Sequence, residues 1–205
     1  MIRLPQGKAV KTDIDLSKVD VSTALKTLRQ GRFTGFLSFE FDAGESVFLF
    51  VEGKMTEALY KDEHCRLTAS LGLEKTLQII REQGGRLNIY RVNEQLADHL
   101  AVALGGVFLL QGECLKGLNI QAVLGRMAQE KRSGCMRIYS DRRVALIFYE
   151  DGHPIGFFHE ECPEMTTEAD VSMSVARDEG ALLDVLVPAE RVLSEATDLL
   201  SDTFD

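Results

Sequence analysis

The chain contains 205 residues, of which 45% are hydrophobic and 27% charged, a balance typical of a folded protein with an apolar core. Its longest apolar run extends from Leu100 to Leu110, about half of the ~20 residues that a membrane-spanning helix needs. The first residues lack the apolar segment of a signal peptide, and the four cysteines form no C-x-x-C pair. These features argue against a membrane-spanning or disulfide-stabilised secreted protein, and we expect a cytoplasmic one.

The net charge of −9 is concentrated near the end of the chain. Residues 160–205 contain 2 basic and 13 acidic residues, whereas residues 1–159 contain 21 basic and 19 acidic residues. Such an acidic region repels nucleic acid and anionic membranes and attracts basic proteins. Alternatively, these acidic residues only solvate the exposed faces of surface helices. In either case we expect no nucleic-acid or membrane partner.

Two stretches of the chain match each other at a constant spacing of 99 residues. Residues 19–60 align with residues 118–159 without a gap, and the identical pairs are Leu25/Leu124, Gln30/Gln129, Gly35/Gly134, Asp42/Asp141 and Gly53/Gly152. The match resumes where Gly85 aligns with Gly180, at a spacing of 95. A repeat of this kind indicates a duplicated structural unit. We therefore predict two tandem copies, at residues 1–112, including an N-terminal extension, and at residues 113–205.

Each copy begins with a short amphipathic helix that is followed by strands. Val21, Leu25 and Leu28 recur at helical spacing, as do their counterparts in the second copy. In residues 35–41 apolar and polar side chains alternate, which predicts a half-buried strand. Residues 47–51 form a continuous apolar run, which is typical of a central strand.

A third strand is predicted at residues 55–60, and at residues 155–158 of the second copy. There Pro154 must lie at the start or at an edge, because it cannot donate a ladder hydrogen bond. A helix, a glycine and a fourth strand complete each copy. The run from Leu100 to Leu110 is interpreted as a buried helix that bends or ends at its two glycines. The expected fold class is α+β, with two tandem copies of an antiparallel β-meander packed with helices.

Small polar or acidic residues followed by glycine mark the turns of both copies. An acidic residue and a glycine between two apolar runs predict a tight hairpin, because glycine accepts a positive φ. A hydroxyl residue before glycine predicts a turn from helix to strand, since the hydroxyl caps loose backbone groups. The residues of these turn motifs are Thr34, Gly35, Glu52, Gly53, Ser133, Gly134, Asp151 and Gly152.

The chain lacks the sequence motifs of nucleotide binding and covalent catalysis, namely a P-loop, a dinucleotide fingerprint and a G-x-S-x-G elbow. The hydroxyls of Thr34 and Ser133 could act as nucleophiles, but a turn explains them better. His64 and Cys65 are a weak candidate for a Cys–His nucleophile. We expect no catalytic residues and no cofactor.

His153, His159 and Cys162 are weak candidates for a metal site. Imidazole and thiolate are good zinc ligands, and acidic residues follow closely in the sequence. A predicted strand separates the two histidines, however, and no standard zinc spacing is met. We expect no metal site, and a metal-dependent hydrolase that uses these residues remains a remote alternative.

Two further groups of residues could either bind a partner or ligand, or have a purely structural role. Basic residues around the first hairpin of the second copy could receive phosphate or an acidic surface, or could offset the acidic end of the chain. Aromatic residues of the central strands could line a ligand pocket or form the core. We favour the framework for both groups. The basic residues are Lys131, Arg132, Arg137, Arg142 and Arg143, and the aromatic ones are Phe48, Phe50, Phe148, Tyr149, Phe157 and Phe158.

The order of the elements and of the turn residues resembles the PATAN domain, a bacterial module. The matching stretches of the first copy are residues 32–37, 50–55 and 81–87, and those of the second copy are residues 131–134 and 149–155. The resemblance implies a bacterial signalling protein that mediates protein–protein contacts, often beside response-regulator receiver domains.

We therefore expect a non-catalytic signalling or regulatory adaptor. Its duplicated scaffold would bind another protein, such as a response regulator or another signalling protein. The main alternative is a sensor that binds a small ligand in a pocket between sheet and helices.

Overall fold

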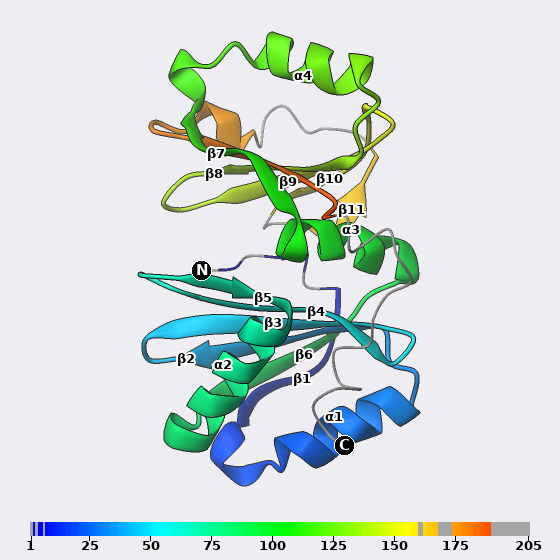
Figure 1. The fold of residues 1–205 in the computed structure, drawn as a ribbon, viewed down its shortest axis with the longest axis vertical. Coiled ribbons are helices and arrows are strands. Elements are labelled where there is room, and N and C mark those ends of the chain that lie inside the picture. Colours follow the sequence, from blue (N-terminus) through cyan, green and yellow to red (C-terminus); the bar gives the residue numbers. More distant parts are fainter. Residues whose placement is uncertain (1, 3, 6, 160–161, 168–173, 190–205) are drawn as a thin grey trace. The chain divides into compact units, whose positions relative to one another are not determined.

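The computed structural model describes residues 2, 4–5, 7–159, 162–167 and 174–189 of the chain. The chain divides into two compact units, chiefly residues 6–105 and 106–190. Each unit contains one six-stranded sheet, and every strand pairing is antiparallel (Figure 1). The predicted α+β class with two copies of a β-meander is therefore confirmed. None of the helices in these ranges is long and apolar enough to cross a membrane.

The first unit contains six strands and three α-helices in its described residues. The strands follow the spatial order β1-β6-β2-β3-β4-β5. Along the chain the elements are β1 (Lys8–Asp15), a 3-10 turn η1 (Leu16–Lys18), α1 (Val21–Gln30), β2 (Gly35–Phe41), β3 (Gly44–Val51), β4 (Lys54–Asp62), β5 (Arg66–Thr68), α2 (Ala69–Gln83), β6 (Arg86–Arg91) and α3 (Glu94–Gly105).

The second unit repeats this topology, with the spatial order β7-β12-β8-β9-β10-β11. At the spacing of 95 residues, the η4 turn corresponds in sequence to the last turn of α2. Along the chain the described elements are β7 (Val107–Cys114), η2 (Leu115–Gly117), α4 (Ile120–Gln129), β8 (Gly134–Tyr139), β9 (Val144–Glu150), β10 (His153–His159), β11 (Cys162–Thr166), η4 (Val175–Arg177) and β12 (Leu182–Val187).

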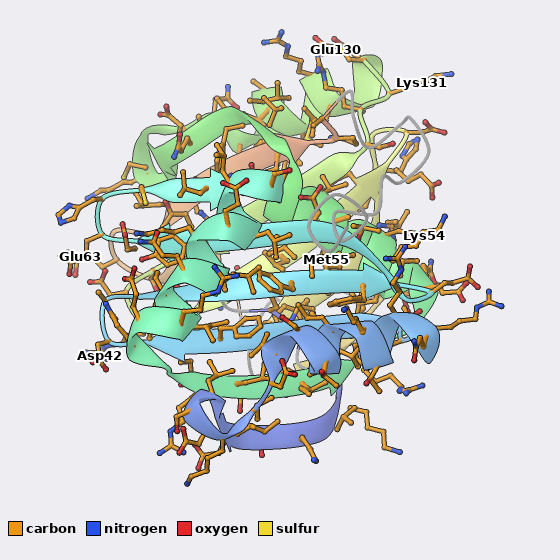
Figure 2. The ribbon with its side chains drawn as sticks, turned by 60° about the horizontal axis from the view of Figure 1, so that its bottom comes forward. Asp42, Lys54, Met55, Glu63, Glu130 and Lys131 are labelled. Atoms are coloured by element: carbon orange, nitrogen blue, oxygen red, sulfur yellow. The ribbon has the colours of Figure 1, made fainter. Side chains whose placement is uncertain are left out.

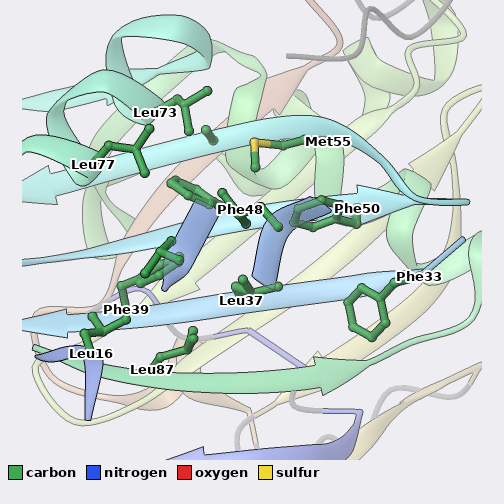
Figure 3. Close-up of a cluster of buried hydrophobic side chains, with 13 residues drawn as sticks. Leu16, Phe33, Leu37, Phe39, Phe48, Phe50, Met55, Leu73, Leu77 and Leu87 are labelled. Atoms are coloured by element: carbon green, nitrogen blue, oxygen red, sulfur yellow. The ribbon is translucent and has the colours of Figure 1, made fainter. Parts of the chain in front are cut away.

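The core of the first unit lies between one face of its sheet and the helices α1 and α2. Leu25 of α1 is fully buried there, and Leu73 and Leu77 of α2 pack on the same cluster (Figure 3). The strands contribute Leu37, Phe39, Phe48, Phe50, Met55 and Leu87. Phe48 and Phe50 therefore belong to the core, as the interpretation of the aromatic residues expected.

The helix α3 covers the opposite face of the first sheet. Its side chains Leu100 and Leu104 are almost completely buried, and α3 packs on β3 and β4 (Figure 1). At the end of α3, a side chain on Gly105 would overlap the carboxyl group of Glu57 on β4. Glycine at this position lets the helix end approach the strand closely.

In the second unit, the core is formed by different residues at positions equivalent to those of the first core. Met127 of α4, Met136 of β8 and Tyr149 of β9 are buried together. These residues stand 99 positions after Leu28, Leu37 and Phe50 of the first core. The counterparts of Phe39 and Phe48 are Ile138 and Ile147, so the second core has fewer aromatic rings.

The structure begins the second copy earlier than the expected boundary after Gly112. The chain divides after Gly105, because β7 pairs with β12 of the second sheet. The expected N-terminal extension of the first copy likewise contains β1, which pairs with β6. The interpretation of the apolar run from Leu100 to Leu110 as a buried helix that bends or ends at its two glycines agrees with the helix α3, which does end at Gly105; the strand β7 follows from Val107.

The hairpins of the first sheet place turns at both of its ends. The β2–β3 turn with Asp42 and the β4–β5 turn with Glu63 lie at one end, and the β3–β4 turn before Lys54 lies at the other (Figure 2). The β3–β4 turn lies beside the end of α1, where the first of the turn motifs is located.

Candidate functional site

The turn motif of the first copy joins the end of α1 to the β3–β4 hairpin. The hydroxyl of Thr34 accepts a hydrogen bond from the backbone N–H of Glu52 at 2.9 Å. The backbone N–H of Gly53 donates to the carbonyl of Phe33 at 2.8 Å. The carboxylate of Glu52 bonds the guanidinium of Arg32 at 2.6 Å. The hydroxyl of Thr34 and the carboxylate of Glu52 therefore both take part in bonds within the turn.

The second copy makes the same backbone bonds 99 positions later. The hydroxyl of Ser133 accepts from the N–H of Asp151 at 3.1 Å, and the N–H of Gly152 donates to the carbonyl of Arg132 at 2.9 Å. Lys131 and Asp151 stand 99 positions after Arg32 and Glu52. Like their counterparts, Lys131 and Asp151 have positive φ values, at 47° each.

The glycines of these motifs stand where no side chain fits. Gly53 and Gly152 have φ values of 84° and 80°. A Cβ on Gly53 would lie 3.0 Å from the Cα of Arg32, and one on Gly152 would lie 2.6 Å from the carbonyl oxygen of Met127. At these positions the hairpin approaches the preceding helix, so glycine serves both the turn and the contact.

A second repeated site holds the bulge of each edge strand. In the first copy the side-chain oxygen of Asn88 accepts a hydrogen bond from the N–H of Asp13 at 2.8 Å. In the second copy the carboxylate of Asp184 accepts from the N–H of Gly112 at 2.7 Å. Asp13 and Gly112 have φ values of 56° and 66°. The acceptor side chain on β6 or β12 thus satisfies a backbone donor that the bulge leaves without a ladder partner.

The chemistry around this repeated site differs between the copies. Asn88 donates to Glu40 at 2.9 Å, whereas Asp184 accepts from Arg137 at 2.8 Å and from the hydroxyl of Tyr139 at 3.5 Å. Burial first, and Asp184 second, raise the pKa of Tyr139, so the phenol remains a donor. Where the first copy has the neutral amide of Asn88, the second copy has the buried carboxylate of Asp184, paired with the partly exposed Arg137.

The sequence did not single out Asp184, Asn88 and Tyr139. A signal existed, because Asn88 precedes Asp184 by 96 residues within the second matching stretch. The alignment used a spacing of 95 residues, so it placed Asn88 opposite Leu183, one position before Asp184, and the equivalence was missed. The β-sheet registers Ser38↔Asn88 and Arg137↔Asp184 establish it.

The candidate metal ligands are separated by the strand β10. His153 is its first residue and His159 its last. The backbone of Cys162 pairs with that of His159, while the side chain of Cys162 lies outside what the structure describes. Within the described residues, no three His, Cys, Asp or Glu side chains gather in a way that could hold a metal ion.

His64 and Cys65 belong to the turn between β4 and β5. The carboxylate of Asp62 accepts the backbone N–H groups of His64 and Cys65, each at 2.7 Å. These two bonds lower the pKa of Asp62 to about 2. Burial first, and Asp62 second, raise the pKa of the Cys65 thiol, which disfavours the thiolate that a nucleophile requires.

Basic residues of the second copy pair with acids of the same unit in the described part of the chain. Arg132 bonds Glu130, Arg143 bonds Asp178 at 3.0 Å, and Arg137 bonds Asp184. The Arg143 guanidinium is also the main reason that the pKa of Asp178 is lowered. Asp178 and Asp184 belong to the acidic residues 160–205, whose charge this group was expected to offset, whereas Glu130 lies outside them.

A cavity of about 440 Å³ lies in the first unit between the start of α1 and the end of α2. Its lining includes the apolar side chains of Leu77 and Ile80 and the polar residues Asp20, Ser22 and Arg81. The carboxylate of Asp20 accepts from the N–H and hydroxyl of Thr23 at the start of α1, and these bonds lower its pKa. The cavity thus offers an apolar surface beside a carboxylate and a guanidinium.

Residues 2–104 match the model of a family described as an uncharacterized protein conserved in archaea, DUF2226. The match covers half of the chain. The chain belongs to this family. The matched stretch ends one residue before the main segment of the first compact unit does, so the part of the chain that matches is the first copy of the repeated fold. No curated protein and no solved structure matches the chain.

This membership corrects the expected resemblance to the PATAN domain and the bacterial origin that it implied. The stretches that carried the resemblance contain the turn motifs at Gly35 and Gly53. In the structure these residues meet general demands of a helix–strand turn and a tight hairpin. Such residues recur in unrelated β-meanders, and therefore they did not identify the family.

Proposed function

We propose that this DUF2226 protein is a non-catalytic regulatory adaptor that acts in the cytoplasm by binding another protein. The observation that carries the proposal is the use of the repeated polar residues. Thr34 and Ser133 accept backbone hydrogen bonds in both copies, which is a framework role. A scaffold duplicated with its framework bonds and varied elsewhere is well suited to binding.

The partner we propose has a basic surface. Residues 160–205 carry 13 acidic and 2 basic side chains, and a charge excess of this size attracts an oppositely charged protein. Association driven by exposed charges weakens when salt is added, because mobile ions screen them.

The test is affinity capture from a native lysate with the full chain, at low and at high salt. We expect one partner enriched at low salt and depleted at high salt. A bait in which the acids of residues 190–205 become amides should recover less of it. The control bait carries the same number of acid-to-amide changes at exposed positions of the first unit, namely Asp42, Glu63, Glu74, Glu94 and Asp98. Equal recovery by all baits, or turnover of a substrate by the purified chain, would contradict the proposal.

A small-ligand sensor is the second candidate, and the cavity beside α1 favours it. A cavity that brings apolar side chains such as Leu77 together with a few charged ones such as Arg81 can hold a small amphiphilic molecule. A thermal-shift screen with small amphiphilic metabolites should then give a ligand that raises the melting temperature. Ser22→Arg, at an exposed lining position, should fill the cavity and abolish the shift. A screen without any shift would remove this candidate.

A further inference from the structure

The cavity between the start of α1 and the end of α2 joins the core of the first unit to exposed charged groups. Its charged lining residues, Asp20 and Arg81, are exposed. Side chains of a close-packed core are held in fixed positions, so a ligand can bury an apolar group against them while its polar end stays near water. The apolar lining residues belong to the core cluster or pack against it, and they are Leu16, Val19, Val21, Leu77 and Ile80.

The carboxylate of Asp20 caps α1, but capping does not require its negative charge. It accepts hydrogen bonds from the N–H of Thr23 at 3.2 Å and from the hydroxyl of Thr23 at 2.6 Å. In the second copy Asn119 stands 99 positions later and caps α4 with a neutral oxygen, which accepts from the N–H of Ala122 at 3.1 Å. Asparagine and aspartate are about equally good caps. The oxygens of Asp20 also retain lone pairs that can accept a further hydrogen bond.

The guanidinium of Arg81 is likewise not used to hold the fold together by charge pairing. Within the described part of the chain it forms no ion pair, either with Asp20 or with another acidic residue. The residue 95 positions later in the second copy is Ala176. The charge of Arg81, like that of Asp20, therefore occurs in the first copy and not at the equivalent position of the second. A guanidinium presents a planar fork of N–H donors that fits a carboxylate.

We propose that this cavity binds a free amino acid with an apolar side chain. The side chain of the ligand packs against Leu77 and Ile80. Its carboxylate bonds the guanidinium of Arg81, and its ammonium group bonds the carboxylate of Asp20. The volume of about 440 Å³ lies within the range of roughly 300–1,000 Å³ that small-molecule sites have. The inference rests on the small-ligand sensor, the second candidate function, and specifies the class of its ligand.

The two opposite charges of the cavity favour a ligand that also carries both. An apolar carboxylate can pair with Arg81, but it brings its negative charge near that of Asp20. An apolar amine can pair with Asp20, but it brings its positive charge near that of Arg81. Like charges that approach each other repel, so either ligand gains one attraction and suffers one repulsion. An amino acid gains both attractions, because its ammonium and carboxylate groups are separate.

The test is titration calorimetry of the full chain with free leucine and with two probes that each lack one of its charges. Isocaproate lacks the ammonium group and isoamylamine lacks the carboxylate. Leucine should bind at least about tenfold more tightly than either probe, because each probe loses a hydrogen bond between charged groups.

Two results of this titration would overturn the proposal. If a probe with a single charge binds as tightly as leucine, the cavity holds ligands of another class and the sensor candidate survives. If leucine does not bind, the proposal fails, and the sensor candidate fails with it only when the thermal-shift screen also finds no ligand.

Two variants assign the charges of the ligand to the residues of the cavity. Asp20→Asn keeps the cap, as Asn119 shows, and should abolish the advantage of leucine over isocaproate. Arg81→Gln should abolish its advantage over isoamylamine. Both variants should keep the circular dichroism spectrum of the wild type. Lys54→Gln removes an exposed charge outside the cavity and should leave leucine binding unchanged. Wild-type affinity for leucine in both cavity variants would overturn the proposal, because leucine would then bind elsewhere.

Discussion

The hydroxyl of Thr34 accepts a hydrogen bond from the backbone N–H of Glu52 at 2.9 Å, and Ser133 repeats the bond with Asp151 at 3.1 Å. Each bond joins the segment after a helix to a hairpin far along the chain. Thr34→Val keeps the shape of the side chain and removes the acceptor. We expect it to lower the free energy of unfolding by about 1 kcal/mol, measured by urea denaturation. Thr34→Ser retains the hydroxyl and should cost less, so an equal loss in both variants would contradict this role.

The hairpin glycines should tolerate no side chain. Gly53→Val combines a positive φ with contact between the new side chain and the backbone of α1. We expect a loss of about 3 kcal/mol or more, and the same for Gly152→Val. Gly125→Ala is the control, because nothing lies within 4 Å of its added Cβ in α4. It should stabilise the protein by up to about 1 kcal/mol, and melting temperatures measure both effects.

The stabilising effect of the ion pair between Arg137 and Asp184 should require both side chains. Asp184→Asn removes the charge beside Arg137 and leaves an oxygen for the N–H of Gly112, as Asn88 does in the first copy. We expect it to cost about 2 kcal/mol. Adding Arg137→Ser recreates the Ser38 and Asn88 pair of the first copy. The double variant should therefore be more stable than the sum of the single losses predicts. Strict additivity in the double-mutant cycle would show that the two side chains are not coupled.

Stability should fall at acid pH partly through Asp62. The backbone bonds from His64 and Cys65 lower the pKa of its carboxyl from 3.8 to about 2. A lowered folded-state pKa means that the carboxylate stabilises the protein fully above pH 3.8 and loses this effect as the pH falls toward 2. Asp62→Asn should thus be less stable than the wild type at neutral pH, and the difference should shrink over that window. Urea midpoints at several pH values measure it, and a constant difference would contradict the assignment.

The central hairpins were predictable because their sequence pattern is local. Alternation in residues 35–41 and the Glu52–Gly53 turn determine strands and their connection without reference to distant residues. The repeat then extended the interpretation to the second copy, although Leu37 and Phe50 had become Met136 and Tyr149.

The edge strands were missed because their pattern is not that of a half-buried strand. β1 is exposed along most of its length, so Lys8 and Lys11 do not alternate with buried residues. β7 begins with apolar residues directly after α3, and its first residues read as a continuation of that helix. Only the pairing with β6 and β12 reveals both strands, and such pairing is a long-range property.

The pairs of polar side chains on the sheets could not be predicted from the sequence either. Asp184 and Arg137 are far apart in the chain and become neighbours only when β12 lies beside β8. The resemblance of the turn motifs to a bacterial family rested on residues such as Gly53, which many hairpins need.

The central claim is that the repeated hydroxyl residues serve the fold and not the chemistry. It is tested most directly in the double variant Thr34→Val with Ser133→Ala, compared with the wild type for stability and for partner capture at a temperature where both are folded. The account predicts a lower unfolding midpoint with unchanged recovery of the partner. An unchanged midpoint with loss of recovery would contradict it, because the two hydroxyls would then act in binding and not in the framework.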